Sequence, residues 1–154
     1  MFSVFLILHS CIRWLVLLSL LILLIRSYWA WIHHKAFNRK DNILRLITVS
    51  IAHLQLSIGL VLYILSPIVR YFYQHFTEAV HITQIRFFGM EHSTMMLLAM
   101  TCISIGSIKA KRARLSQDKF KCLAIWYSIA LIMIFTSIPW AFSPFTARPY
   151  LRWF

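Results

Sequence analysis

Residues 2–25 read FSVFLILHSCIRWLVLLSLLILLI, an apolar run interrupted by only a few polar side chains. About 20 consecutive apolar residues are enough to cross the hydrocarbon core of a bilayer as a helix. Three further runs of similar length follow at residues 43–65, 87–108 and 120–142. Each run must be helical there, because the bilayer core offers no water to the polar groups of the backbone. The pattern predicts an all-α integral membrane protein.

The four runs take up most of the 154 residues, of which 60% are hydrophobic and 13% are charged. A soluble domain carries roughly a quarter charged residues, so this composition excludes a soluble globular domain. We expect one transmembrane domain over residues 1–154, built as a four-helix bundle. An interfacial segment at residues 67–86 and a tail at residues 143–154 complete it. The chain has no Walker loop, dinucleotide fingerprint or zinc-finger spacing. It also has no C-x-x-C-H motif, and the absence of this motif excludes a covalently attached c-type haem.

The net charge of +12 is concentrated in two segments. The segment after the first span and the segment after the third span carry these Lys and Arg residues: Arg26, Lys35, Arg39, Lys40, Arg45, Lys109, Lys111, Arg112, Arg114, Lys119 and Lys121. The opposite side has Arg70, Arg86, Arg148 and Arg152. By the positive-inside rule both basic segments are cytoplasmic, and both termini lie outside. The charge therefore indicates topology and anionic lipid headgroups as partners, and no nucleic acid.

The two halves of the chain share a spacing that indicates an internal duplication. Asp41, a helix N-cap candidate, precedes Ser66-Pro67 by 25 residues, and Asp118 precedes Ser143-Pro144 by the same distance. We expect two helical hairpins of the same topology, related by a pseudo-two-fold axis along the membrane normal. A coincidence among apolar segments is the alternative.

The duplication places two histidines at equivalent positions, His9-Ser10 in the first span and His92-Ser93 in the third. At 1.5 Å of helix rise per residue, His9 lies roughly 10 Å and His92 roughly 8 Å below the outer edge of its span. Two level, opposed histidines on two helices are what the iron of a haem b with two axial histidines requires. We therefore expect His9 and His92 to be axial ligands of haem iron.

Three further polar residues in the spans are candidates for cofactor binding: Arg13, Glu91 and His53. A charge at this depth is costly, so Arg13 and Glu91 are expected to form an ion pair, or Arg13 to bind a haem propionate. His53 lies roughly 20 Å deep, too far down to share the same iron. It is expected to be a core histidine hydrogen-bonded across the bundle, or part of a second haem site or a proton path.

Four stretches carry a family resemblance: HSCIRWLVL at residues 9–17, AHLQLSIGLVLY at 52–63, RFFGMEHS at 86–93 and IPWAFSP at 138–144. Together they touch all four spans. The pattern resembles small four-span membrane proteins of Bacteroidetes-type bacteria that are loosely labelled cytochrome b, and more distantly one half of haem A synthase. The paired histidines of that enzyme do not occur on the same spans here, so its activity is not implied.

The leading functional prediction is a b-type haem protein of the bacterial cytoplasmic membrane. It would transfer single electrons between a quinone and a membrane partner. Two other classes use the same residues. One is a non-catalytic scaffolding subunit of a larger membrane complex. The other is a transporter, or a proton or metal pathway. Whether the protein is an enzyme stays open, because no nucleophile and base are paired in the sequence.

Overall fold

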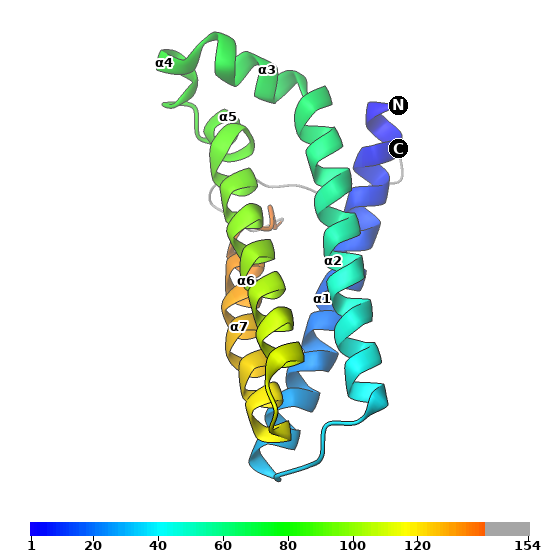
Figure 1. The fold of residues 1–154 in the computed structure, drawn as a ribbon. Coiled ribbons are helices and arrows are strands. Elements are labelled where there is room, and N and C mark those ends of the chain that lie inside the picture. Colours follow the sequence, from blue (N-terminus) through cyan, green and yellow to red (C-terminus); the bar gives the residue numbers. More distant parts are fainter. Residues whose placement is uncertain (141–154) are drawn as a thin grey trace.

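Four long helices run side by side in the computed structural model, which describes residues 1–140 (Figure 1). They are α1 (Phe2–Ile32), α2 (Arg39–Leu65), α6 (His92–Arg112) and α7 (Ser116–Thr136). The described residues contain no strand, so the predicted all-α bundle is confirmed. The Ser143-Pro144 half of the predicted duplication and the tail at 143–154 lie outside the described residues.

A run of short helices connects the two halves of the bundle. These are α3 (Pro67–Gln74), α4 (Phe76–Ala79), α5 (Thr83–Arg86) and the π-helix η1 (Phe87–Glu91), which leads directly into α6. Pro67 stands at the first helical position of α3, where its missing N–H costs nothing, and the Ser66 side chain accepts from the Val69 backbone N–H. This run crosses the end of the bundle near the N-terminus (Figure 1).

Four helical stretches are long and apolar enough to cross a membrane: Phe2–Ile32, Arg39–Leu65, Thr83–Arg112 and Ser116–Thr136. Large apolar side chains point outward along them, for example Leu18, Ile64 and Ile132, each more than half exposed. Such a surface fits contact with lipid tails rather than water. The chain is therefore a multi-pass membrane protein.

Helix α2 begins earlier than its apolar run, because its start is set by a capping box. Asn38 is the N-cap, its side chain accepts from the Asp41 backbone N–H, and the Asp41 carboxylate accepts from the Asn38 backbone N–H. The prediction of Asp41 as N-cap is thus wrong by three residues. Asp118 likewise lies in the first turn of α7, whose N-cap position is Leu115.

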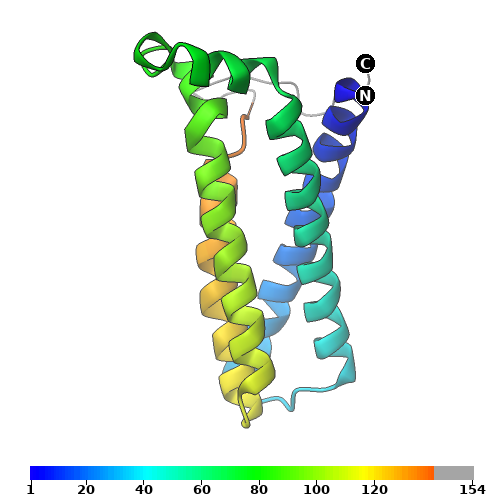
Figure 2. The same ribbon diagram turned by 45° about the horizontal axis from the view of Figure 1, so that its top comes forward.

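The helices pack as two hairpins, α1 with α2 and α6 with α7. The first helix of each hairpin also contacts the second helix of the other, α1 against α7 and α6 against α2, which is the pattern that a two-fold axis requires. The two contacts are unequal, because α1–α7 is extensive and α2–α6 is sparse. The hairpins diverge toward the end that carries the N-terminus (Figure 2).

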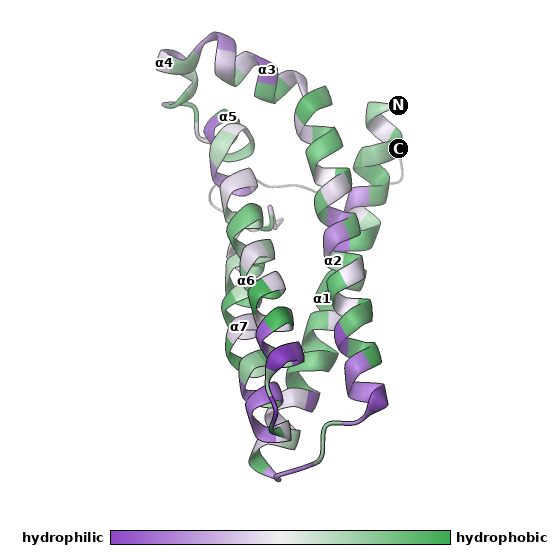
Figure 3. Ribbon diagram, in the orientation of Figure 1, coloured by the Kyte–Doolittle hydropathy of each residue, from purple (hydrophilic) through white to green (hydrophobic). Residues whose placement is uncertain are grey.

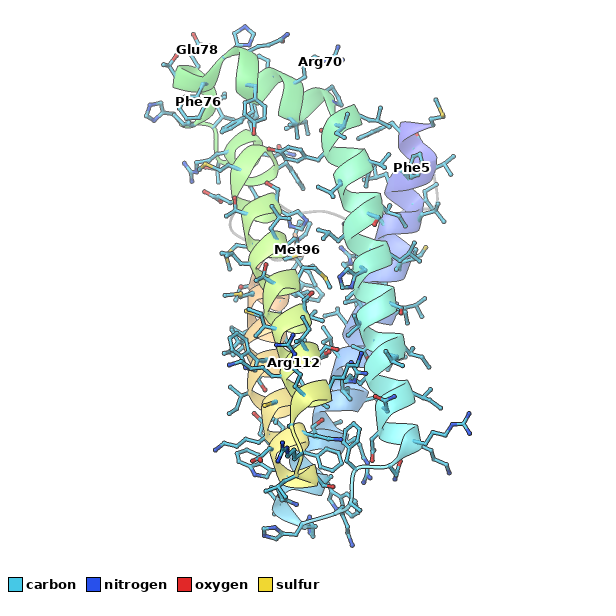
Figure 4. All side chains as sticks on the ribbon, viewed as in Figure 1. Phe5, Arg70, Phe76, Glu78, Met96 and Arg112 are labelled. Atoms are coloured by element: carbon cyan, nitrogen blue, oxygen red, sulfur yellow. The ribbon has the colours of Figure 1, made fainter. Side chains whose placement is uncertain are left out.

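Both basic segments lie at one end of the bundle, as predicted. The connections at residues 33–38 and 113–115 meet there, and hydrophilic residues gather at this end (Figure 3). Arg112 marks it, while Arg70 and Glu78 lie at the opposite end (Figure 4). The side of the membrane on which each end lies remains a prediction from the charge distribution.

Arg45 does not belong to the solvated basic segment to which the sequence assigned it. Its side chain is buried at 5% exposure, donates to Asn42 Oδ1 at 2.8 Å and also donates to the Ser107 hydroxyl. Next to it, Arg26 forms an ion pair with the buried Asp41 at 2.7 Å. These bonds join α1, α2 and α6 at the closed end of the bundle, away from the region where the hairpins diverge.

Candidate functional site

His9 of α1 and His92 of α6 lie next to each other between the two hairpins. Their ring centroids are 6.5 Å apart and their planes are inclined at 74°. The predicted juxtaposition of the two histidines is therefore confirmed. The two histidines meet because they lie at equal depth on α1 and α6, the first helices of the two hairpins, and because the hairpins pack in a two-fold pattern.

A π-turn sets the direction of His92. Residues Phe87–Glu91 form η1, and α6 starts at His92 itself. A π-turn inserts one extra residue, which rotates everything after it about the helix axis. Gly89 lies within this turn against Phe72 of α3, where an added Cβ would come 2.4 Å from the Phe72 ring. The interfacial helix α3 thus packs directly on the turn that orients His92.

The His92 ring is held through one nitrogen, which leaves the other toward the cavity. Its Nδ1 is 2.8 Å from the backbone carbonyl oxygen of Ser137, at the C-cap of α7. A carbonyl can only accept, so Nδ1 carries the proton and Nε2 the lone pair. Ligand histidines in metal sites typically donate their second nitrogen to a carbonyl or carboxylate in this way.

The His9 ring lies against α2. An added Cβ on Gly59 would be 3.2 Å from His9 Cε1 and 3.6 Å from His9 Nδ1, so the ring packs tightly on this glycine and would have to shift slightly for a larger residue. The Gln55 side chain donates from Nε2 to the His9 backbone carbonyl at 2.9 Å. Gln55 was not predicted to take part in the site, and Gly59 was expected only to allow close helix packing, without a contact to His9. The sequence feature that could have indicated this contact is a glutamine within an apolar span, followed by a glycine one helical turn later.

A cavity of about 540 Å³ surrounds the two histidines. Its walls are mostly apolar. Met96, on the side of α6 that faces α2, is one of the lining residues (Figure 4). Leu60 of α2 and Leu97 of α6 line it while remaining 47% and 49% exposed. The cavity therefore opens sideways, between α2 and α6, toward the space that lipid occupies.

The predicted ion pair between Arg13 and Glu91 is wrong. Glu91 Oε1 lies 2.6 Å from Arg86 Nε, while Arg86 Nη1 donates to the Val80 carbonyl. The π-turn explains why Glu91 pairs with Arg86 and not with Arg13. Residues five apart in sequence lie above one another in a π-turn, and Arg86 and Glu91 are five residues apart. Arg13 lines the cavity, and its guanidinium lies over the Trp14 ring at 5.4 Å from the ring centroid.

His53 is not part of this site. The residue is exposed on the outer face of α2, and its Nδ1 bonds to the Val49 carbonyl of its own helix at 2.9 Å. The expected hydrogen bond across the bundle is therefore wrong. Gln55 and Gly59 occupy the cavity face of α2, and His53 lies well away from that face around the helix axis.

The described residues hold no cluster of three or more His, Cys, Asp or Glu side chains that could bind a bare metal ion. The two histidines instead suit a metal whose remaining ligands come from a prosthetic group. No protein-family model, no curated protein and no solved structure matches this chain, so the meaning of the site depends on its geometry.

Proposed function

We propose that this protein binds haem b between His9 and His92 and uses it for one-electron transfer within the membrane. The separation of the two rings carries the proposal. Two metal–imidazole bonds of about 2 Å place the ring centroids roughly 6 Å apart when the metal lies between them. The observed centroid distance is 6.5 Å, and an inclination of 74° between the two ring planes is compatible with a metal between them.

The surroundings of the two histidines also fit a haem. The cavity volume of about 540 Å³ lies in the range of roughly 300–1,000 Å³ that is usual for small-molecule and cofactor sites. Aliphatic walls suit a porphyrin, and cofactor sites between facing helices are common in four-helix bundles. Arg13 supplies a cation at the cavity, which is the partner that a propionate carboxylate requires.

A haem held by two histidines supplies a reversible one-electron couple. His9 and His92 would hold the haem between the two hairpins. The positive charge of Arg13 would favour the more negatively charged, reduced state. The apolar walls exclude water and keep the site in a low-dielectric environment. The redox partners would be a quinone or a subunit of a complex in the bacterial cytoplasmic membrane.

A lipid-soluble ligand without haem is the second candidate, and the sideways opening favours it. A reduced quinone would enter between Leu60 and Leu97 directly from the bilayer, and one of its hydroxyl groups would donate to the lone pair of His92 Nε2.

One measurement separates the two candidates. The full chain, expressed with haem supply and purified in mild detergent, should show a Soret band and a sharp low-spin spectrum on dithionite reduction. One haem per chain is expected. A colourless protein from haem-supplied cells, also unable to take up added haemin, would contradict the haem proposal and favour the quinone.

A further inference from the structure

His9 lacks the ring hydrogen bond that His92 has. Within residues 1–140, His9 Nδ1 is buried and makes no hydrogen bond of normal geometry, although the Gln55 backbone lies near the ring. The Oε1 atom of Gln55, on the facing helix, is also buried without a partner. A neutral histidine whose Nε2 binds a metal must carry its proton on Nδ1, and a carboxamide oxygen can only accept. The two atoms are therefore complementary.

They also lie in one contact between α1 and α2. The Gln55 carboxamide is already bound to His9, because its Nε2 donates to the His9 carbonyl at 2.9 Å. Gly59, one helical turn further along α2, lies against the Nδ1–Cε1 edge of the same ring. The last torsion of a glutamine side chain has a broad energy profile, so small rotations of the Gln55 carboxamide cost little.

We propose that Gln55 is the positioning residue of His9. Its carboxamide holds one residue at two points, with Nε2 on the backbone carbonyl and Oε1 on the Nδ1–H group. This fixes the tautomer that turns Nε2 of His9 to the cavity, as the Ser137 carbonyl does for His92. The inference rests on the proposed function, and it gives each of the two ligand histidines a hydrogen-bond acceptor of its own.

The tautomer is testable in the haem-free protein. The full chain with ¹⁵N-labelled histidine, in detergent micelles, should show His9 protonated on Nδ1. Gln55→Leu should shift His9 toward the Nε2-protonated form, whereas Gln55→Glu keeps an acceptor and should keep the Nδ1–H form. Gln117→Leu is the matched control, since Gln117 Oε1 is also buried without a described partner but belongs to the far end of α7.

Haem titration supplies an independent readout. Gln55→Leu should weaken haem binding about 10- to 100-fold, the usual effect of losing the partner of a ligand histidine. Gln55→Glu should restore tight binding, and Gln117→Leu should resemble the wild type. The midpoint potential should rise in Gln55→Leu and fall in Gln55→Glu, because a stronger acceptor makes the imidazole a stronger electron donor.

The outcomes separate the two proposals. A wild-type protein that binds no haem but loses its His9 Nδ1–H in Gln55→Leu contradicts haem binding and supports the role of Gln55. An unchanged tautomer in Gln55→Leu overturns the role of Gln55, whether haem binds or not. If Gln55→Leu does not fold, Gln55→Glu decides: its carboxylate must shift the His9 Nδ1 resonance, and an unshifted resonance overturns the inference.

Discussion

At the scale of single residues, the two central histidines are held by different means. His92 depends on a backbone carbonyl that the end of α7 leaves without a helical partner. His9 depends on side chains and a glycine of α2. A main-chain acceptor cannot be removed by substitution, so His9 is the more sensitive of the two to changes in its neighbours.

Replacement of either ring tests the proposed ligands. His9→Ala and His92→Ala should each abolish the low-spin spectrum and reduce haem retention at least about 10-fold, because one axial bond is lost. Absorption spectra of the oxidised and reduced proteins check this. His53→Ala is the matched control, since His53 lies outside the cavity, and it should keep the wild-type spectrum. Loss of haem in His53→Ala alone would reject His9 and His92 as the ligands while leaving haem binding intact.

A double-mutant cycle tests the ion pair that the structure contains. Arg86→Leu and Glu91→Leu should show a coupling of about 0.2–1 kcal/mol, the size measured for pairs that remain partly exposed. Thermal unfolding in detergent provides the four stabilities. The cycle of Arg13→Leu with Glu91→Leu serves as comparison and should be additive within about 0.5 kcal/mol. Strong coupling in the comparison cycle would restore the pairing first expected from the sequence.

At the scale of elements, the π-turn and the interfacial helix α3 form one unit. Phe72 is 2% exposed and its ring occupies the space that a Cβ at Gly89 would need. The Tyr63 hydroxyl of α2 donates to the Gly89 carbonyl at 2.7 Å and ties the same turn to the other hairpin. The direction of His92 is thus determined jointly by η1, α2 and α3.

Gly89→Ala should disturb this unit. Its Cβ meets the Phe72 ring at 2.4 Å, so α3 or the π-turn must shift, and we expect a loss of about 1–3 kcal/mol in stability. Thermal unfolding measures the loss, and the haem spectrum reports the orientation of His92. In a Phe72→Ala background the ring is absent, so the same substitution should cost much less. An equal cost in both backgrounds would show that Gly89 is needed for backbone conformation rather than for space.

At the scale of the whole molecule, the bundle is closed at one end and open at the other. Polar bonds of Arg26, Asp41 and Arg45 hold the basic end together. The hairpins diverge toward the N-terminal end (Figure 2). The cavity with His9 and His92 opens to the side in this half of the bundle. A redox partner would therefore reach the site from the bilayer or from the end covered by α3.

The orientation of the bundle is open to a labelling test. In a background whose three native cysteines are replaced by alanine, Ala36→Cys should react only from the cytoplasmic side. Thr77→Cys should react with a membrane-impermeant reagent from outside intact cells, because the basic end remains inside. The reverse pattern would place the histidines near the cytoplasmic face and reverse the assignment of redox partners.

The sequence by itself determined the four spans, the common basic end and the juxtaposition of His9 and His92. The length of a span, the charge of a loop and the depth of a residue are each obtained by counting residues along the chain. They can therefore be predicted without knowing how the helices pack. The tertiary structure alone decided the partner of Glu91, the outward position of His53 and the contact of Gln55 and Gly59 with His9. These depend on the rotation of each helix about its axis, which a single π-turn changes by about 100° and which the apolar pattern of a lipid-facing helix does not specify.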